Sequence, residues 1–302
     1  MDRTGGTMNI VSANGAVVVG VDGSGPALAA ARWAAGEARR RGVGLRVVTV
    51  VGWDGHATRA IPEPEADVAR DALLSAARDT VDDAAAAAIA AAPDVDVDVR
   101  VRSGAVSTVL MDEADGAALL VVGNRGNGGF TGLLVGSAGV SVAAHARCPV
   151  VVVRGDGRAV GRGAPVVVGV GESVGGEAAV GFAFEEASRR GVPLVAVHAW
   201  IDPGIDPLLG AYADWDAMAV QQQRVLVDAV APWTAKHPDV EVRELVVRDG
   251  AVRALVAAAE GAALVVVGSR GYGPARGLLV GSVSQGLLHH APCPVAVVRG
   301  TG

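Results

Sequence analysis

Two glycine-rich segments contain residue types that bind phosphate. The first contains Gly123, Asn124, Arg125, Gly126, Asn127 and Gly128 and continues to Gly136 and Ser137. Glycine has no Cβ, so backbone N–H groups can approach an anion closely. A helix beginning after the loop adds free N–H groups and a partial positive charge. We expect the Ser137 hydroxyl at the N-cap and the Arg125 charge beside it. The segment predicts a phosphate cradle.

An acid belongs to the same predicted site. Asp22 follows the apolar run that ends in Gly20-Val21. We expect its carboxylate opposite the glycine loop, as an acceptor for a ribose or a base. Each feature also has an ordinary structural explanation: the glycines form a tight turn, Ser137 caps a helix, and Asp22 is a turn acid. The residues alone leave both interpretations open.

The pattern occurs twice in the chain. Gly123, Gly136 and Cys148 recur as Gly268, Gly281 and Cys293, at a constant spacing of 145 residues. This period is too long for a solenoid and indicates a duplicated domain. We predict domains at 14–154 and 165–299, joined by a glycine- and arginine-rich linker at 155–164. Common descent of the halves explains part of the repetition.

Short apolar runs alternate with helical patterns in each half. Runs rich in valine predict buried strands at 15–21, 45–51, 118–122 and 149–153, and a half-exposed edge strand at 95–101. In that edge segment we expect Asp94, Asp96 and Asp98 to form an exposed face. Helices are predicted at 27–41, 66–92, 105–115 and 137–146, and the second half repeats the order. Crossover helices between strands predict an α/β fold with a parallel sheet and helices on both faces.

Composition excludes several classes of protein. The chain has 302 residues, 51% apolar but only 3% aromatic, with 42 glycines and a net charge of −6. The absence of a basic cluster argues against nucleic acid and anionic membranes as partners. No apolar run is long enough to span a bilayer, and the N-terminus lacks a signal-peptide pattern. We therefore expect a cytoplasmic protein.

Known catalytic and nucleotide motifs are largely absent. The Walker pattern fails because the single lysine, Lys236, lies on a predicted helix end. No zinc spacing, calcium loop or nucleophile elbow occurs, so we expect no metal site and name no catalytic residue. His145 and His290 are expected to cap helix carbonyls. Cys148 and Cys293 are expected to pack in the core.

The spacing Gly123-x2-Gly126-x9-Gly136-Ser137 and its copy Gly268-x2-Gly271-x9-Gly281-Ser282 resemble the universal stress protein family. Val19-Gly20-Val21-Asp22-Gly23-Ser24 and the closing Cys148-Pro149-Val150 are also similar to that family. The resemblance covers nearly the whole chain as two tandem domains and is closest to actinobacterial tandem members. It implies two open five-stranded parallel sheets, each of order 3-2-1-4-5, as in adenine nucleotide alpha-hydrolase-like folds.

The resemblance implies binding of ATP, with or without Mg²⁺, by a regulatory protein of the stress response. It also implies an internal pseudo-dimer and a possible homodimer. The competing hypothesis is a slow ATPase or nucleotidyl-transfer enzyme that uses the same loops. One position departs from the family, because Gly171 stands where the first half has Asp22, which weakens the second site. The expected nucleotide-binding residues are Gly20, Asp22, Val50, Val122, Gly123, Asn124, Arg125, Gly126, Asn127, Gly128, Gly136, Ser137 and Ala138 in the first half, and Gly169, Ala199, Val267, Gly268, Ser269, Arg270, Gly271, Tyr272, Gly273, Gly281, Ser282 and Val283 in the second.

Overall fold

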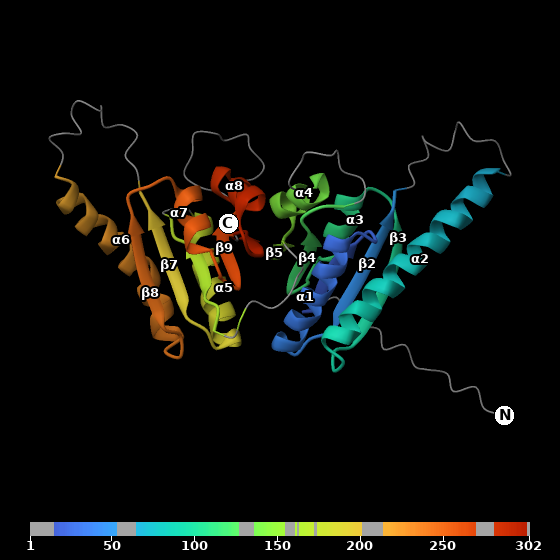
Figure 1. The fold of residues 1–302 in the computed structure, drawn as a ribbon, viewed down its shortest axis with the longest axis horizontal. Helices are drawn as coiled ribbons and strands as arrows, with labels where there is room; N and C mark the ends of the chain where they lie inside the picture. Colours follow the sequence, from blue (N-terminus) through green and yellow to red (C-terminus); the bar gives the residue numbers. More distant parts are fainter. Residues whose placement is uncertain are drawn as a thin grey trace. The chain divides into compact units, whose positions relative to one another are not determined.

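The computed structural model describes residues 15–52, 65–126, 136–154, 161, 163–171, 174–200, 214–269 and 281–300. The chain divides into two compact units, Met1–Arg158 and Ala159–Gly302 (Figure 1). Each unit alternates strands with helices, as the sequence predicts.

The first unit contains five parallel strands in the order β3-β2-β1-β4-β5. This order confirms the expected 3-2-1-4-5 arrangement. Its elements are β1 (Val17–Val21), α1 (Gly25–Arg41), β2 (Leu45–Val51), α2 (Glu65–Ala91), β3 (Val97–Ser103), α3 (Val106–Glu113), β4 (Leu119–Gly123), α4 (Ser137–His145) and β5 (Val150–Val153).

The second unit repeats this topology, with strand order β8-β7-β6-β9-β10 and parallel pairing throughout. Its elements are β6 (Val166–Gly169), α5 (Val174–Arg190), β7 (Leu194–Ala199), α6 (Trp215–Lys236), β8 (Val242–Val247), α7 (Ala251–Ala258), β9 (Leu264–Gly268), α8 (Ser282–His290) and β10 (Val295–Val298).

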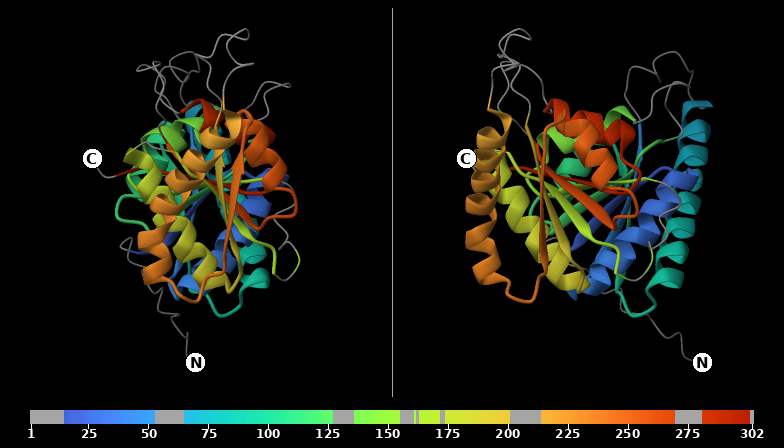
Figure 2. Two further views of the ribbon diagram at one scale, coloured as in Figure 1. Left: turned by 90° about the vertical axis from the view of Figure 1, so that its left-hand side faces the viewer. Right: turned by 60° about the vertical axis from the view of Figure 1, so that its left-hand side comes forward.

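Helices cover both faces of each sheet. In the first unit α1 packs against α2 (Figure 2), and α3 packs against α4. In the second unit α5 packs against α6, and α7 against α8. This layering is the result expected of right-handed crossovers between parallel strands. It places the carboxyl ends of all five strands of a unit at one edge of its sheet, where ligands bind in such folds.

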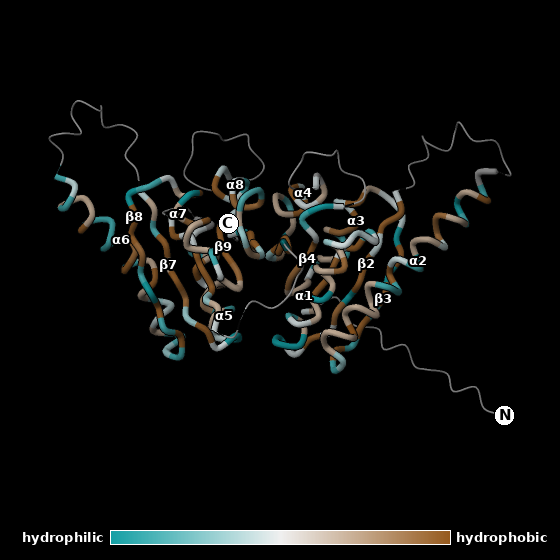
Figure 3. Tube along the Cα trace, in the orientation of Figure 1, coloured by the Kyte–Doolittle hydropathy of each residue, from teal (hydrophilic) through white to brown (hydrophobic). Residues whose placement is uncertain are grey.

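Small apolar residues form the core. The strands β1 and β4 are buried almost throughout, and α1 buries a face made of alanines together with Trp33. Figure 3 shows hydrophobic residues along the inner strands β2 and β4, and hydrophilic residues along the outer strand β8. Alanine on the helix lets it approach the sheet closely, which explains how a core with so few aromatic residues is filled.

The start of α1 is fixed by local hydrogen bonds. The Ala27 N–H donates to Ser24 Oγ at 3.2 Å, so Ser24 is the N-cap. Pro26 lies in the first turn, where its missing N–H costs no hydrogen bond. Gly42, with φ of +65°, ends the helix in the left-handed conformation. These contacts position the loop between β1 and α1, which carries Asp22.

The prediction for the edge strand was wrong in one respect. Asp98 of β3 is buried at 7% exposure, whereas Val99 is 39% exposed. Asp98 Oδ2 accepts from Arg46 Nε at 3.2 Å and from Arg100 Nε at 2.9 Å. Arg46 lies directly opposite Asp98 on β2, so an ion pair across the two strands takes the place of an apolar contact.

No helix in the described part of the chain has both the length and the apolar character required to cross a membrane.

Candidate functional site

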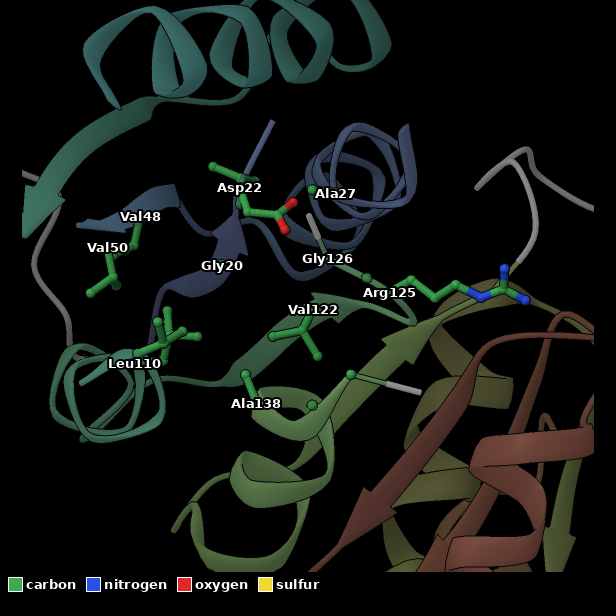
Figure 4. Close-up of a pocket in the computed structure, with 15 residues that line it drawn as sticks. Gly20, Asp22, Ala27, Val48, Val50, Leu110, Val122, Arg125, Gly126 and Ala138 are labelled. Carbon is green, nitrogen blue, oxygen red and sulfur yellow. The ribbon is translucent and has the colours of Figure 1, made fainter. Parts of the chain in front are cut away.

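A pocket of about 360 Å³ lies at the carboxyl ends of β1, β2 and β4 in the first unit (Figure 4). Its walls come from the β1–α1 loop, from α3, and from the segment that leads into α4. The residues that line it are Gly20, Val21, Asp22, Ala27, Val48, Val50, Val106, Leu110, Val122, Gly123, Arg125, Gly126, Gly136, Ala138 and Gly139.

One end of the pocket is apolar. Val48 and Val50 of β2 lie on one side, and Leu110 of α3 lies on another (Figure 4). Gly20 packs closely against this wall, because a Cβ at this position would lie 2.9 Å from Leu110 Cδ1 and would require the leucine side chain to shift. An apolar slot of this kind fits the flat face of a nucleobase or another aromatic group.

The other end consists of backbone and small residues. The Gly136 N–H donates to the Asn124 carbonyl at 2.9 Å, and the Asn124 N–H donates to Val153 O at 3.0 Å. The first bond holds the two ends of the glycine loop together, and the second joins the loop to the end of β5. The N-cap of α4 is Gly136, which offers no side-chain cap to the helix. The first N–H groups of α4 therefore lack the usual capping side chain at the edge of the pocket.

This arrangement corrects the predicted N-cap. Ser137 is the first residue of α4 and Gly136 the cap, with an extended backbone at φ −66° and ψ 145°. The second unit repeats the correction, because Gly281 caps α8 and Ser282 is its first residue. Serine is favoured at N-caps, but here the chain turns into the helix one residue earlier.

Asp22 lies at the junction of the two loops. Its Oδ1 accepts from the Ser24 N–H at 3.1 Å, and the Ser24 hydroxyl donates to Arg125 O at 3.4 Å. Asp22 Oδ2 lies so close to Gly126 that a Cβ on this glycine would collide with it. The carboxylate therefore lies against the glycine loop, as Figure 4 shows. The hydrogen bond from the Ser24 N–H is an Asx turn, so Asp22 also has the role of a turn acid.

Gly123 has a structural role that the sequence analysis did not identify. A Cβ here would lie 2.9 Å from both the carbonyl carbon and the oxygen of Pro26. Since those atoms belong to the backbone of α1, they cannot move aside easily. Gly123 therefore allows β4 to approach the start of α1.

The structure brings most of the predicted first-half residues together. Those lining the pocket are Gly20, Asp22, Val50, Val122, Gly123, Arg125, Gly126, Gly136 and Ala138. Asn124 contributes the backbone bonds described above, and the Arg125 side chain extends away from the apolar end (Figure 4). Asn127 and Gly128 lie outside the described residues.

Several lining residues were missed, including Val48, Val106 and Leu110. Val48 could have been found from Val50, because alternate residues of a strand share a face. Val106 and Leu110 could have been found as an i, i+4 pair on the helix that follows the edge strand.

The second unit repeats much of this geometry. A Cβ at Gly169 would lie 2.9 Å from Leu255 Cδ1 and 3.2 Å from Val267. The Gly281 N–H donates to Ser269 O at 2.9 Å, and the Ser269 N–H donates to Val298 O at 2.8 Å. These contacts match those of Gly20 and of Gly136 in the first unit.

Two positions of the second unit differ. Gly171 is exposed, and an added Cβ would meet no atom of the described residues within 4 Å. The Ser284 hydroxyl donates to the Gly268 carbonyl at 2.6 Å, whereas the equivalent position in the first unit is Gly139. Ala199 ends β7, and Val283 follows Ser282 in α8. Arg270, Gly271, Tyr272 and Gly273 lie outside the described residues.

Other reactive side chains lie in structural positions. Both cysteines are buried, which confirms the predicted core packing. Burial raises the pKa of the Cys148 thiol to about 11, so it stays protonated and unreactive. His145 Nδ1 lies 2.9 Å from the Ser141 carbonyl, as expected for a helix end. Among the residues that the structure describes, no cluster of His, Cys, Asp and Glu is arranged to hold a metal ion.

Comparison with known proteins gives a consistent result. The model of the universal stress protein family matches residues 14–154 and 164–299. Universal stress protein Rv2623 of Mycobacterium tuberculosis is 38% identical over 291 residues, which cover 94% of this chain and 96% of that protein. A universal stress protein of Mycolicibacterium smegmatis is 37% identical over 290 residues, with coverage of 94% and 96%.

A solved structure has the same fold. The crystal structure of a universal stress protein from Archaeoglobus fulgidus matches with a TM-score of 0.70. The match covers 96% of this chain and 97% of that one at 19% sequence identity, so it bears on the fold alone.

Proposed function

Because the chain belongs to the universal stress protein family, with a tandem pair of family domains, we propose that it is a regulatory protein that binds ATP. The observation that carries the proposal is the pocket of the first unit. Its volume of about 360 Å³ lies within the range of about 300–1,000 Å³ that is usual for small-ligand sites.

The two ends of the pocket suit the two ends of a nucleotide. In the proposal the adenine lies between Val50 and Val106, on the apolar wall that also includes Val122. The phosphates lie at Gly126 and Gly136, where backbone N–H groups and the start of α4 offer donors and a partial positive charge. In the proposal the walls nearest the nucleotide are formed by Gly20, Gly123 and Ala138. The other binding residues of the glycine loop are Asn124, Arg125, Asn127, Gly128 and Ser137.

Asp22 is proposed to accept hydrogen bonds from the ribose hydroxyls. Its carboxylate lies in the pocket wall between the apolar end and the glycine loop. If ATP arrives with Mg²⁺, the same carboxylate is the acid in the pocket lining that could contact the ion, which would neutralise phosphate charge. Oxygen ligands from one or two carboxylates together with phosphates are usual for Mg²⁺.

The second unit is proposed to bind a nucleotide at the equivalent positions, with lower affinity because Gly171 replaces the acid. A hydrogen bond to a charged group is worth about 1.5–3 kcal/mol, so its loss weakens binding about tenfold or more. The proposed contacts are Gly169, Ala199, Val267, Gly268, Ser269, Arg270, Gly271, Tyr272, Gly273, Gly281, Ser282 and Val283.

Calorimetry tests this proposal. Titration of ATP into the full chain should give saturable binding, and Gly136→Val should abolish it at the first site. This glycine suits the test because, among the described residues, the nearest atom to an added Cβ is Gly126 N, at 3.9 Å. Gly161→Val, at an exposed glycine whose added Cβ meets no atom of the described residues within 4 Å, is the matched control and should bind as the unmodified chain does. A nucleotide-free chain that takes up no ATP contradicts the proposal.

A slow ATPase or nucleotidyl-transfer enzyme is the second candidate. The observation in its favour is the Asp22 carboxylate beside the proposed phosphate site. This candidate predicts that ADP accumulates over hours in proportion to protein, and that the double variant Ser137→Ala/Ser282→Ala stops it. Stable ATP in the presence of the protein at saturating concentration would leave binding as the function.

The proposal includes a cytoplasmic role in the stress response, carried out by a homodimer. Light scattering after gel filtration tests the assembly. A mass of twice the chain is expected, and a mass equal to one chain contradicts the dimer.

A further inference from the structure

The two units can be compared residue by residue at the apolar end of the pocket. In each unit the first strand pairs with the second in the same register, with Val17 opposite Leu45 and Val166 opposite Leu194. Val50, the sixth residue of β2, therefore corresponds to Ala199, the sixth residue of β7. In the second unit the side chain at this position of the wall is therefore smaller by two carbon atoms.

The opposite wall changes in the same direction. Leu110 lies over Gly20, and Leu255 lies over Gly169 at the same distance of 2.9 Å from an ideal Cβ. These contacts make α3 and α7 equivalent in position. Val106, four residues before Leu110, therefore corresponds to Ala251, four residues before Leu255.

The rest of the apolar wall is retained. Val48, Leu110 and Val122 correspond to Val197, Leu255 and Val267, and these three are buried at 1%, 2% and 3% exposure. Among these five apolar positions the two units therefore differ only at Val50 and Val106, and each residue is smaller in the second unit.

The other end changes in the opposite direction. Ala138 and Gly139 at the start of α4 correspond to Val283 and Ser284 of α8. The Ser284 side chain is 2% exposed and is held by its bond to the Gly268 carbonyl. The second unit thus has smaller side chains at two positions of the base end, and larger side chains at the start of the helix that borders the phosphate end.

On this basis, and resting on the proposed function, we propose that the second unit accepts adenine nucleotides with an apolar substituent on the base, which the first unit excludes. Val50 and Val106 line the base end of the first pocket, so an alkyl group added to the base meets their side chains. Ala199 and Ala251 together remove four carbon atoms from the equivalent walls. A difference of one methylene in an apolar pocket is worth about 10–200-fold in discrimination.

The test uses the intact chain and three ATP derivatives, each with a butyl group at N6, C2 or C8 of adenine. Together they present the substituent from three edges of the ring, so one of them directs it between Ala199 and Ala251. Calorimetry should show a derivative that binds at one site per chain and binds the first unit at least about tenfold more weakly. The double variant Ala199→Val/Ala251→Val should abolish this binding and leave ATP binding at the first site unchanged.

The reciprocal variant Val50→Ala/Val106→Ala is the matched control. It should raise the number of derivative molecules bound from one to two per chain. Val106 is 40% exposed and Val50 is half-buried, so both can be shortened without loss of a core contact. Circular dichroism of both double variants verifies that the fold is retained.

The outcomes separate the two proposals. A chain that binds neither ATP nor a derivative overturns the proposed function. A chain that binds ATP but takes up no derivative, or takes up the derivatives equally in both units, overturns the difference in selectivity. Binding of a derivative that survives Ala199→Val/Ala251→Val does the same.

Discussion

The two units are built on one scaffold but differ where a ligand would lie. Both place a glycine under a leucine of the third helix, and both close the glycine loop with one backbone bond of 2.9 Å. They differ at the end of the first strand, where the first unit has Asp22 and the second has Gly171. They also differ at Val50 and Val106, whose equivalents in the second unit are alanines. The contacts of the glycines are thus shared by the two units, whereas residues that line the pocket differ between them.

One group of buried charges is the same in both units. Glu37 in α1 is fully buried and forms ion pairs with Arg40 and Arg41, each at 2.9 Å. Glu186 in α5 repeats this arrangement with two arginines of its own helix. This pairing belongs to the shared scaffold.

A second ion cluster occurs in the first unit. Arg46 of β2 contacts Asp98 at 3.2 Å and Glu113 at 3.3 Å, and Arg102 also contacts Glu113. The equivalents of Arg46 and Glu113 in the second unit are Val195 and Ala258. The two units therefore stabilise the same layer, between the second strand and the third helix, by different chemistry.

The largest effect is expected when this cluster is broken. Arg46→Leu leaves the nearly buried carboxylate of Asp98 with less compensation, because Arg46 and Asp98 are only 7% and 6% exposed in their side chains. Removing one partner of a buried pair costs about 3–5 kcal/mol. Chemical denaturation should show a loss of this order in the free energy of unfolding.

The triple variant Arg46→Val/Asp98→Val/Glu113→Ala is the control, since it removes the three most buried side chains of the cluster and leaves Arg100 and Arg102, which are 27% and 41% exposed. Two of the new residues match Val195 and Ala258 of the second unit, which has Arg243 at the position of Asp98. Replacing buried charged groups together by apolar residues is often neutral or stabilising. It should recover most of the loss. A triple variant no more stable than Arg46→Leu would show that charge is essential to this layer.

The next effect concerns Cys148. Burial raises the pKa of its thiol from 9.0 to about 11, so the folded state holds the proton more tightly than the unfolded state. The resulting stability is complete below pH 9 and is lost as the pH rises toward about 11, by about 2–3 kcal/mol. Denaturation between pH 8 and 11 should show this decline, and Cys148→Ala should reduce its slope. Equal slopes in both proteins would contradict the assignment.

At the site itself, Asp22→Ala should weaken ATP binding at the first unit about 10–100-fold, because a charged hydrogen-bond acceptor is lost. The second unit should be unaffected. Asp22→Asn is the matched control for the fold. In the unmodified protein the Ser24 N–H donates to Asp22 Oδ1, and the amide oxygen of asparagine can accept the same hydrogen bond. Calorimetry measures both.

The reverse change sharpens the comparison. Gly171→Asp places the acid in the second unit, at a position where an added Cβ lies more than 4 Å from every atom in the described part of the chain. ATP affinity at the second site should rise toward that of the first. An affinity that stays the same in both Asp22→Ala and Gly171→Asp would show that the carboxylate has no part in binding.

The smallest effect is expected at a surface pair of the second unit. The Ser188 hydroxyl donates to Asp239 Oδ2 at 2.6 Å and lowers the pKa of that carboxyl. The first unit has Arg39 and Asp94 at these positions, so it lacks the hydroxyl. Ser188→Ala should raise the pKa of Asp239 toward its usual value, measured by NMR titration. Because the folded pKa is lowered, the stabilisation is present at neutral pH and is lost as the pH falls through it. An unchanged titration would contradict this role of the serine.

Most of the fold could be predicted because its signals are local. Valine-rich runs such as 45–51 predict strands that are buried on both faces, and the predicted and observed bounds of β2 agree. The doubling of the domain was equally plain from the repeated spacing of Gly123 and Gly136. The domain boundaries and the roles of the site residues remain predictions.

What the sequence could not predict depends on contacts between distant elements. The burial of Asp98 depends on Arg46, a neighbour across the sheet that no local pattern reveals. The need for glycine at 123 comes from the backbone of Pro26. The N-cap of α4 is Gly136 and not the predicted Ser137, because residue propensity does not fix the turn into the helix.

The most direct test of the account is a crystal structure of the chain with ATP at saturating concentration. The account predicts adenine between Val50 and Val106, ribose at Asp22, and phosphates at Gly126 and Gly136 in the first unit. Density for ATP elsewhere, or an empty first pocket at saturating ATP, would contradict it.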